Sequence, residues 1–317
     1  PQDEDKNDEA SARLTARQSP ARSLVAPDFV YPISAVLGAE DAITALSMLT
    51  VVPDLGVVLI AGGPGTGKST LVRGFAEVLP FAAPFVEADP RVGGASIADS
   101  ARRADGGVVY FDRWEHAQTA ADDIGIFLDG LGTSDGSAID PRPRFVVITA
   151  LEHLATIAPS AGSNRSATSS FADRAALSVS LKVPSGADRA EMLRRHIEFT
   201  KDPIAFRKTW EPAQRDLARR LQLARPAELP QPLIRPIAAI CDELAIPSAR
   251  ADVALAHAAS AYAGWHGRTI ASEADVIAVA PMVLAHRLPT PATGTQPSEA
   301  IQDAFHRALG GVHTPIG

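Results

Sequence analysis

The first half of the chain alternates between short apolar runs and segments with apolar residues at helical spacing. Short, β-branched runs without polar interruption are typical of strands buried on both faces of a parallel sheet. Such runs predict strands at 57–61, 85–86, 108–111, 144–149 and 177–181. Helices are predicted between them at 40–49, 71–79, 97–103 and 120–131. This alternation indicates a doubly wound α/β domain with a parallel sheet.

After residue 187 the strand pattern stops and only helical periodicity remains. One helix carries Met192, Ile197 and Phe199, and a second begins at Phe206 and Trp210. Three more are predicted at 234–244, 251–263 and 273–287. The chain should therefore divide into a disordered segment, an α/β domain, a helical connector, an all-α domain and a linker with a short final helix. Their expected bounds are 1–27, 28–185, 186–232, 233–289 and 290–317. A Ser/Ala/Gly-rich stretch at 159–170 predicts a mobile loop.

The strand at 57–61 leads into a complete phosphate-loop pattern, G-x-x-x-x-G-K-[ST]. Its residues are Gly62, Gly63, Pro64, Gly65, Thr66, Gly67, Lys68, Ser69 and Thr70. Glycines let backbone N–H groups surround phosphate oxygens, and the following helix adds its partial positive charge. Lys68 would reach the β- and γ-phosphates, and the Ser69 hydroxyl would be a Mg²⁺ ligand. Because a strand precedes the loop and a helix follows it, a chance match is a poor explanation, and the protein is expected to bind a nucleoside triphosphate.

A second nucleotide signature follows about 45 residues later. The apolar run 108–111 ends in Asp112, whose carboxylate would lie beside the loop and hold the Mg²⁺ hydration shell. Hydrolytic enzymes of this kind usually carry a glutamate next, which orients the attacking water. Here that position holds Arg113, and Glu115 lies two residues further on.

Charge and composition exclude several other classes. The chain has 317 residues and a formal net charge of −7, which argues against a protein whose main task is to hold nucleic acid. A single cysteine, Cys241, excludes an internal disulfide and a cysteine-cluster zinc site. No apolar run approaches the ~18–20 residues of a membrane span, and the acidic N-terminal segment lacks signal-peptide features, so a cytoplasmic protein is expected.

With the phosphate loop, the Asp112 strand and the helical region in this order, the chain resembles an AAA+ ATPase. It resembles the ATPase subunit I of magnesium chelatase more closely, over about residues 29–288. The matching stretches are 31–41, 62–76, 173–179, 198–206 with Trp210, 250–252, 267–269 and 286–288. The resemblance implies an AAA+ core with an all-α lid domain and the cofactors ATP and Mg²⁺.

The resemblance also implies a function and partners. It indicates a motor subunit that hydrolyses ATP in a homo-oligomeric ring, expected to be a hexamer. The ring would drive Mg²⁺ insertion into protoporphyrin IX during chlorophyll or bacteriochlorophyll synthesis. Its partners would be a D-type subunit with AAA+ and integrin-like parts and a large porphyrin-binding H-type subunit. No nucleic acid and no membrane span are expected.

Four further residues take roles by this resemblance. Arg174 occupies the position of the arginine finger, which reaches the γ-phosphate bound by the neighbouring subunit. Arg250 matches the sensor-2 arginine of the lid. Planar, permanently charged guanidinium groups suit a loose phosphoryl transition state. Val36 and Leu37 lie in the apolar stretch that flanks adenine in such motors, although ordinary burial explains their apolarity equally well.

The sequence also departs from the family. Besides Arg113, the sensor-1 position holds Glu152 instead of a polar asparagine. Either Arg113 and Glu152 form an ion pair, or Glu152, less favourably Glu115, supplies the missing carboxylate. The chain is also shorter than the family between 86 and 107 and between 131 and 144, where the family carries β-hairpins used for partner contact.

Two alternatives stay open. A hydrolysis-deficient scaffold or regulatory ring subunit would bind ATP without useful turnover, as Arg113 would favour. A MoxR-type chaperone or a cobalt-chelatase ATPase would share the core, although the 198–206 segment argues against both. A DNA-acting AAA+ protein is the least favoured, because the chain is acidic.

Overall fold

The computed structural model describes residues 29–80, 83–89, 91, 94–114, 146–154, 167–288 and 297–310. Residues up to Val30 form a unit of their own, and the fold below is that of Tyr31–Gly317. Several predictions lie outside the described residues. These are the disorder of 1–27, the helix at 120–131, Glu115, the linker at 290–296 and the first part of the loop at 159–170.

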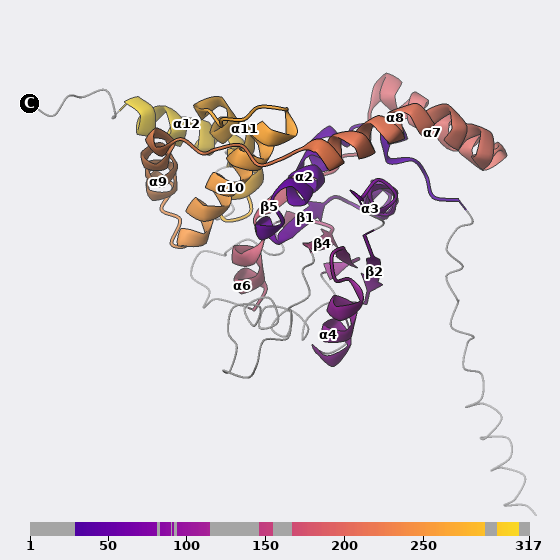
Figure 1. The fold of residues 1–317 in the computed structure, drawn as a ribbon, viewed down its shortest axis with the longest axis horizontal. Helices are drawn as coiled ribbons and strands as arrows, with labels where there is room; N and C mark the ends of the chain where they lie inside the picture. Colours follow the sequence, from indigo (N-terminus) through magenta and orange to yellow (C-terminus); the bar gives the residue numbers. More distant parts are fainter. Residues whose placement is uncertain are drawn as a thin grey trace, which may run out of the picture. The chain divides into compact units, whose positions relative to one another are not determined.

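In the described part of the chain, five parallel strands form one sheet in the order β2-β3-β4-β1-β5 (Figure 1). The strands are β1 (Val57–Ala61), β2 (Phe85–Ala88), β3 (Val108–Phe111), β4 (Val146–Leu151) and β5 (Leu177–Ser180). Because every pairing is parallel, all five carboxyl ends lie at one edge of the sheet. The predicted parallel α/β fold is confirmed.

Both faces of the sheet are buried, which explains why the strands are apolar without alternation. Val58 and Ile60 of β1 belong to the core formed with α2 (Glu40–Val51) and α3 (Lys68–Ala76). Their neighbours Val57 and Leu59 belong to a second core on the opposite face, which includes Phe171 of α6 (Ala167–Arg174). A further described helix of the α/β part, α4 (Gly94–Arg103), contacts β2.

The helix α6 corrects one prediction. Residues 167–170 were expected to lie in a mobile loop, but they form the first turn of α6. Local propensity is weak here, since the turn is Ala-Thr-Ser-Ser, and tertiary packing overrides it. The ring of Phe171 stacks on Trp114 with centroids 4.1 Å apart, and both side chains are almost fully buried.

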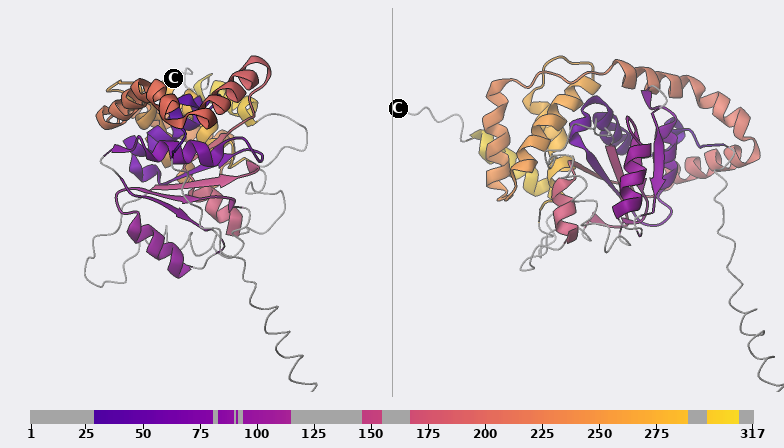
Figure 2. Two further views of the ribbon diagram at one scale, coloured as in Figure 1. Left: turned by 90° about the vertical axis from the view of Figure 1, so that its right-hand side faces the viewer. Right: turned by 60° about the horizontal axis from the view of Figure 1, so that its bottom comes forward.

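Beyond β5 the chain is helical, as predicted. The helices α7 (Gly186–Lys201) and α8 (Pro203–Leu223) pack against each other (Figure 2). Asp202 caps α8 by accepting a hydrogen bond from the Ala205 N–H at 2.9 Å. Near this junction, Phe199 and Phe206 lie with ring centroids 5.0 and 5.3 Å from that of Tyr31. This aromatic contact ties the helical connector to the start of the α/β part.

The C-terminal helices are α9 (Ile234–Glu243), α10 (Ala249–Trp265), α11 (Glu273–Leu284) and α12 (Pro297–Gly310). Most buried positions of α10 are alanines, and these small side chains let the helix pack closely on α2 and α11. Helix α12 packs on α9 and α11, and α11 contacts β5. The core of the α/β part therefore continues into these helices without a break.

The contact between α11 and β5 contains a buried histidine. His286 is fully buried, with Nδ1 2.9 Å from Ser178 Oγ and Nε2 2.9 Å from the Ala175 carbonyl oxygen. Burial, and next the charge of Arg287, lower the pKa of His286 from 6.5 to about 3. His286 is therefore neutral in the folded protein at pH 7.

This burial predicts a pH dependence of stability. Between pH 6.5 and about 3 the unfolded chain binds a proton that the folded protein excludes, so His286 stabilises the fold above pH 6.5 and this contribution is lost on acidification. At pH 5 the loss amounts to about 2 kcal/mol. Urea unfolding at pH 7 and pH 5 should therefore show a drop in unfolding free energy about 2 kcal/mol larger for the wild type than for His286→Gln. Equal drops would contradict the buried, neutral histidine.

Candidate nucleotide-binding site

The predicted phosphate-binding residues lie at the carboxyl edge of the sheet, where ligands of open α/β sheets bind. The loop Gly62–Gly67 connects β1 to α3, and Lys68, Ser69 and Thr70 form the first turn of that helix. Asp112 directly follows β3 and Glu152 directly follows β4. Because β4 lies between β1 and β3, the register brings all three strand ends together.

Glycine is required at two ends of the loop. Gly62 has a φ of +156°, and a Cβ there would lie 2.7 Å from the Leu181 carbonyl oxygen. Its N–H lies 3.1 Å from the carbonyl oxygens of both Leu151 and Glu152, so the loop is fixed to the end of β4. Gly67, with a φ of +87°, is the N-cap of α3 in the left-handed region. The loop therefore turns sharply into a helix N-terminus, which is a natural phosphate-binding site.

The side chains of the first turn of α3 converge as predicted. The Lys68 ammonium donates to the carbonyl oxygens of Gly62 and Gly63 across the loop. Ser69 Oγ donates to Asp112 Oδ2 at 3.2 Å. A hydroxyl and a carboxylate in contact, beside a lysine and a helix N-terminus, form a donor set that fits Mg²⁺ with a nucleotide phosphate.

Tyr110 completes this group, and the sequence analysis did not identify it. Its hydroxyl donates to Ser69 Oγ at 3.2 Å, so Ser69 lies between Tyr110 and Asp112. Burial raises the pKa of the Tyr110 hydroxyl, which therefore stays protonated and can donate. Its position two residues before Asp112 was the available signal, but within an apolar run a tyrosine looks like ordinary strand packing.

Arg113 occupies an unusual backbone position. Its φ of +53° lies in the left-handed region, and its N–H donates to Asp112 Oδ1 at 3.0 Å. Hydrogen bonds from Arg91 lower the pKa of Asp89, which follows β2, to about 2, and the charge of Arg113 adds a smaller contribution. Among the described residues no ion pair joins Arg113 to Glu152, so the predicted pair is not formed in this structure.

The two predicted phosphate-reaching arginines lie elsewhere. Arg174 ends α6, at the amino end of β5, where the Ala176 N–H donates to the Val57 carbonyl oxygen at 3.0 Å. Val57 begins β1 and the phosphate loop follows its other end, so roughly 15 Å of strand separates the two points. Arg250, in the first turn of α10, pairs with Asp173 at 3.1 Å. The structure thus places Arg174 and Arg250 in one group, and Lys68, Ser69 and Asp112 in another.

Val36 and Leu37 follow the short helix η1 (Ile33–Ala35) and are partly exposed. The stretch before them is held against α3, because a Cβ on Gly74 would lie only 2.8 Å from the Tyr31 carbonyl oxygen. The stretch thus lies beside the helix that begins at the phosphate loop. Contact of Val36 and Leu37 with adenine stays a prediction.

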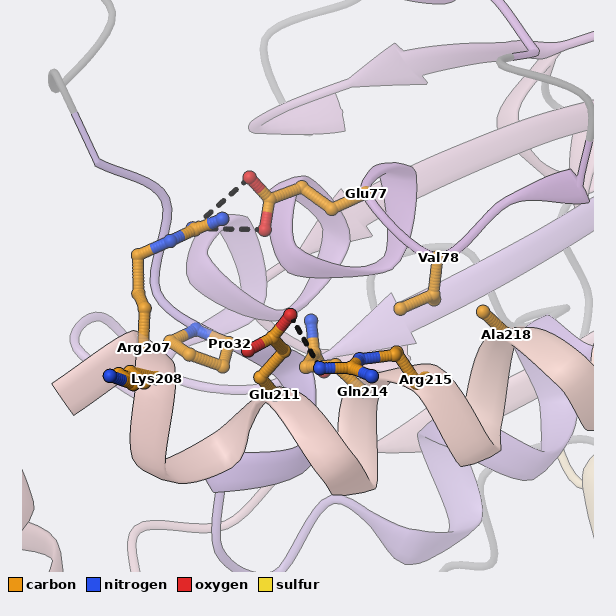
Figure 3. A pocket seen from close by; sticks show the side chains of 9 residues that line it. All are labelled: Pro32, Glu77, Val78, Arg207, Lys208, Glu211, Gln214, Arg215 and Ala218. Atoms are coloured by element: carbon orange, nitrogen blue, oxygen red, sulfur yellow. Dashed lines mark hydrogen bonds and ion pairs between the residues drawn. The ribbon is translucent and has the colours of Figure 1, made fainter. Parts of the chain in front are cut away.

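A separate pocket of about 580 Å³ lies between α8 and the end of α3 (Figure 3). Two ion pairs line it, Arg207 with Glu77 at 3.0 Å and Arg215 with Glu211 at 2.8 Å. No residue of the phosphate loop lines this pocket. The pocket is therefore separate from the phosphate loop and is not assigned to the nucleotide site.

None of the described helices is long and apolar enough to cross a membrane. The described residues also contain no group of three or more His, Cys, Asp or Glu side chains that could hold a metal ion on their own.

Comparison with known proteins agrees with this geometry. The AAA lid domain family matches residues 234–304. A solved structure described as a candidate ATPase from Cytophaga hutchinsonii superposes with a TM-score of 0.59 at 16% identity, over 86% of this chain and 90% of its own. At this identity the likeness establishes the fold only, a parallel α/β sheet followed by a helical lid domain.

Three curated relatives extend the comparison. An uncharacterized Mycobacterium tuberculosis protein is 31% identical over 81% of this chain, which spans only 44% of that protein's length. The magnesium-chelatase 38 kDa subunit of Rhodobacter capsulatus is 28% identical, with 86% of this chain and 92% of the relative covered. A magnesium-chelatase subunit ChlI homolog of Methanocaldococcus jannaschii is 25% identical, with 82% and 86% covered. The chain thus has a parallel α/β sheet followed by a helical domain that matches the AAA lid family, and its sequence is similar to the I subunits of magnesium chelatase.

Proposed function

We propose that this protein is an AAA+ ATPase, the motor subunit of a magnesium-chelatase-type complex. It hydrolyses ATP in a homo-oligomeric ring, and the ring drives Mg²⁺ insertion into protoporphyrin IX by a D-type and an H-type partner subunit. The observation that carries the proposal is the convergence of Lys68, Ser69 and Asp112 at the end of the sheet. The relation to the Rhodobacter capsulatus subunit over 92% of that protein supports the chelatase assignment.

The chain's own groups account for most of the chemistry. Phosphoryl transfer passes through a loose transition state, so catalysis depends mainly on positioning and charge. The loop N–H groups and Lys68 bind the β- and γ-phosphates. To do so, the Lys68 ammonium exchanges its hydrogen bonds to the loop carbonyls for contacts with phosphate oxygens. Ser69 and Asp112 hold the nucleotide's Mg²⁺, which neutralises phosphate charge; the Mg²⁺ that enters the porphyrin is a separate ion and a substrate of the complex.

Arg174 acts on the nucleotide of the neighbouring subunit. In its own subunit it lies at the amino end of the sheet, while the phosphate loop lies at the carboxyl end, and this separation favours action in trans. An arginine supplied in this way stabilises the charge of the transition state and contributes on the order of 10³–10⁵ to turnover. Arg250 reaches the phosphates from the lid once its ion pair with Asp173 breaks and the guanidinium contacts phosphate oxygens instead.

Glu152 supplies the carboxylate that orients the attacking water. Arg113 cannot do so, because its side chain is a cation and has no oxygen that could accept a proton from water. Glu152 follows β4 next to β3, its side chain is exposed, and its carbonyl oxygen accepts from the Gly62 N–H at 3.1 Å. Its carboxylate is thus carried by the backbone that fixes the phosphate loop.

Arg113 favours one alternative, a ring subunit that binds ATP but hydrolyses it too slowly to drive work. Such a subunit would keep the phosphate loop, Ser69 and Asp112 for assembly. It would have no need of a carboxylate at position 152. The two functions therefore differ in whether Glu152 affects turnover.

The first test is steady-state ATP hydrolysis with Mg²⁺, with Lys68→Ala as control. We expect turnover that Lys68→Ala abolishes, because the variant loses the cation at the β- and γ-phosphates. ATP binding and nucleotide-dependent assembly without turnover would overturn the motor function and leave the scaffold. Turnover that fails to support Mg²⁺ insertion when D- and H-type subunits are added would overturn only the chelatase assignment.

The second test addresses the substituted carboxylate. Glu152→Gln should lower turnover by about 10²-fold or more at unchanged ATP affinity, as expected for loss of a positioned base. Glu243→Gln is the matched control, since Glu243 pairs with Arg307 on the surface of the lid domain. If Glu152→Gln hydrolyses ATP as fast as the control, the water is oriented by another group.

A further inference from the structure

Arg174 lies in a turn that receives hydrogen bonds from several side chains of the lid domain. We define the Arg174 turn as residues 173–176, which join the end of α6 to β5. Its far end is fixed to the sheet, since Ala176 N–H donates to the Val57 carbonyl oxygen at 3.0 Å. The rest of the turn is held by side chains that come from α10 and from the residues after α11.

Arg287 holds the backbone on both sides of Arg174. Its Nη2 donates to the carbonyl oxygen of Asp173 at 3.2 Å and to that of Ala175 at 2.7 Å. These are the residues immediately before and after Arg174. One planar guanidinium therefore fixes the peptide unit before Arg174 and the peptide unit after Ala175, and so restrains the turn on both sides of Arg174.

His286 supports the same carbonyl next to Arg287, whose Nη1 lies 3.1 Å from His286 Nε2. Its two ring nitrogens lie 2.9 Å from the Ala175 carbonyl oxygen and 2.9 Å from Ser178 Oγ. With Nε2 of the neutral ring donating to the Ala175 carbonyl oxygen, Nδ1 accepts from Ser178 Oγ, which also lies 3.3 Å from the Met282 carbonyl oxygen of α11. The ring is thus located by β5 and α11 together, which leaves it little freedom to turn.

The burial of Arg287 is costly, and simple packing does not explain it. Its side chain is only 7% exposed, and its Nε has no hydrogen-bond partner in the described part of the chain. Burial lowers the pKa of Arg287 to about 10, from an ordinary 12.5. An apolar residue would fill this space at lower cost. What an apolar residue cannot do is hold the two carbonyls that flank Arg174.

The side chain of Asp173 is held by the lid as well. Its Oδ2 accepts from the Ser248 hydroxyl at 3.0 Å and from Arg250 Nη1 at 3.1 Å, and both donors lie at the start of α10. The start of α10 and the residues just after α11 therefore both contact the Arg174 turn. Any change in the orientation of these helices must change the geometry around Arg174.

We propose that His286 and Arg287 are positioning residues that hold the Arg174 turn in the conformation needed to reach the neighbouring subunit's nucleotide. The lid of each subunit thereby controls hydrolysis at the adjacent site. The inference rests on the proposed function, in which Arg174 acts in trans. It assigns a role to two buried residues that do not themselves touch a nucleotide.

The decisive experiment mixes a slowed variant, Arg287→Lys, with an inactive one, Lys68→Ala. Arg287→Lys keeps a cation but loses the planar fork, so it should lower turnover by at least about 10-fold, part of an arginine finger's contribution, with the KM for ATP changed less than about 2-fold. In a mixed assembly with Lys68→Ala, turnover should recover, because Lys68→Ala subunits supply a well-placed Arg174 to intact sites. Mixing with the double variant Lys68→Ala/Arg174→Ala should give no recovery. Arg307→Lys, which alters a surface pair, should behave as wild type.

A measurement without nucleotide separates this inference from the ATPase function. Amide hydrogen exchange of the isolated Arg287→Lys and His286→Gln variants should be about 10-fold faster in 171–177 and unchanged in 57–61. If wild-type protein lacks turnover, the proposed function fails, and this exchange still decides whether the two residues hold the turn. Faster exchange throughout β1 in one variant would mean that this variant is generally unfolded. The other variant then decides whether the turn is held. Unchanged exchange in 171–177, or a mixed assembly without recovery, would overturn the proposal.

Discussion

The parallel register of β1, β4 and β3 is the constraint on which the rest of the structure depends. It places the phosphate loop, Glu152 and Asp112 at the ends of neighbouring strands, so one peptide group, that of Gly62, can join the loop to β4. A shift of one residue in either pairing would turn Asp112 away from Ser69 and separate the groups that fit Mg²⁺. The two buried faces of the sheet protect this register, because each strand has apolar partners on both sides.

The same sheet also connects the two groups that are proposed to contact phosphate, the phosphate loop and the Arg174 turn. β1 begins beside the Arg174 turn and ends at the phosphate loop, so a single buried strand separates the group that binds phosphate from the group that acts on a neighbour's phosphate. The lid domain contacts the Arg174 turn through Arg250, His286 and Arg287. This arrangement gives a physical route by which the orientation of the lid in one subunit affects the next.

Local sequence was enough to predict the fold and the meeting of Ser69 and Asp112 at the end of the sheet, because the glycines, Lys68, Ser69 and Asp112 occupy fixed positions next to strands. It failed where the outcome depends on distant partners. Tyr110 looks like strand packing until Ser69 is seen beside its hydroxyl. The start of α6 depends on Phe171 packing against Trp114 rather than on propensity, and Arg287 looks like an exposed helix end until its burial is known.

Equilibrium ATP binding measures whether Ser69 and Asp112 form a Mg²⁺-dependent nucleotide site. Affinity should be measured with Mg²⁺ and with a chelator, for the wild type, for Ser69→Ala and for Ser185→Ala as a surface control. We expect Mg²⁺ to tighten binding to the wild type and to the control by about 10-fold or more, the scale of one charge-assisted contact, and Ser69→Ala to lose this gain. Binding that is indifferent to Mg²⁺, or a Ser69→Ala variant with the full Mg²⁺ effect, would show that these residues do not form such a site.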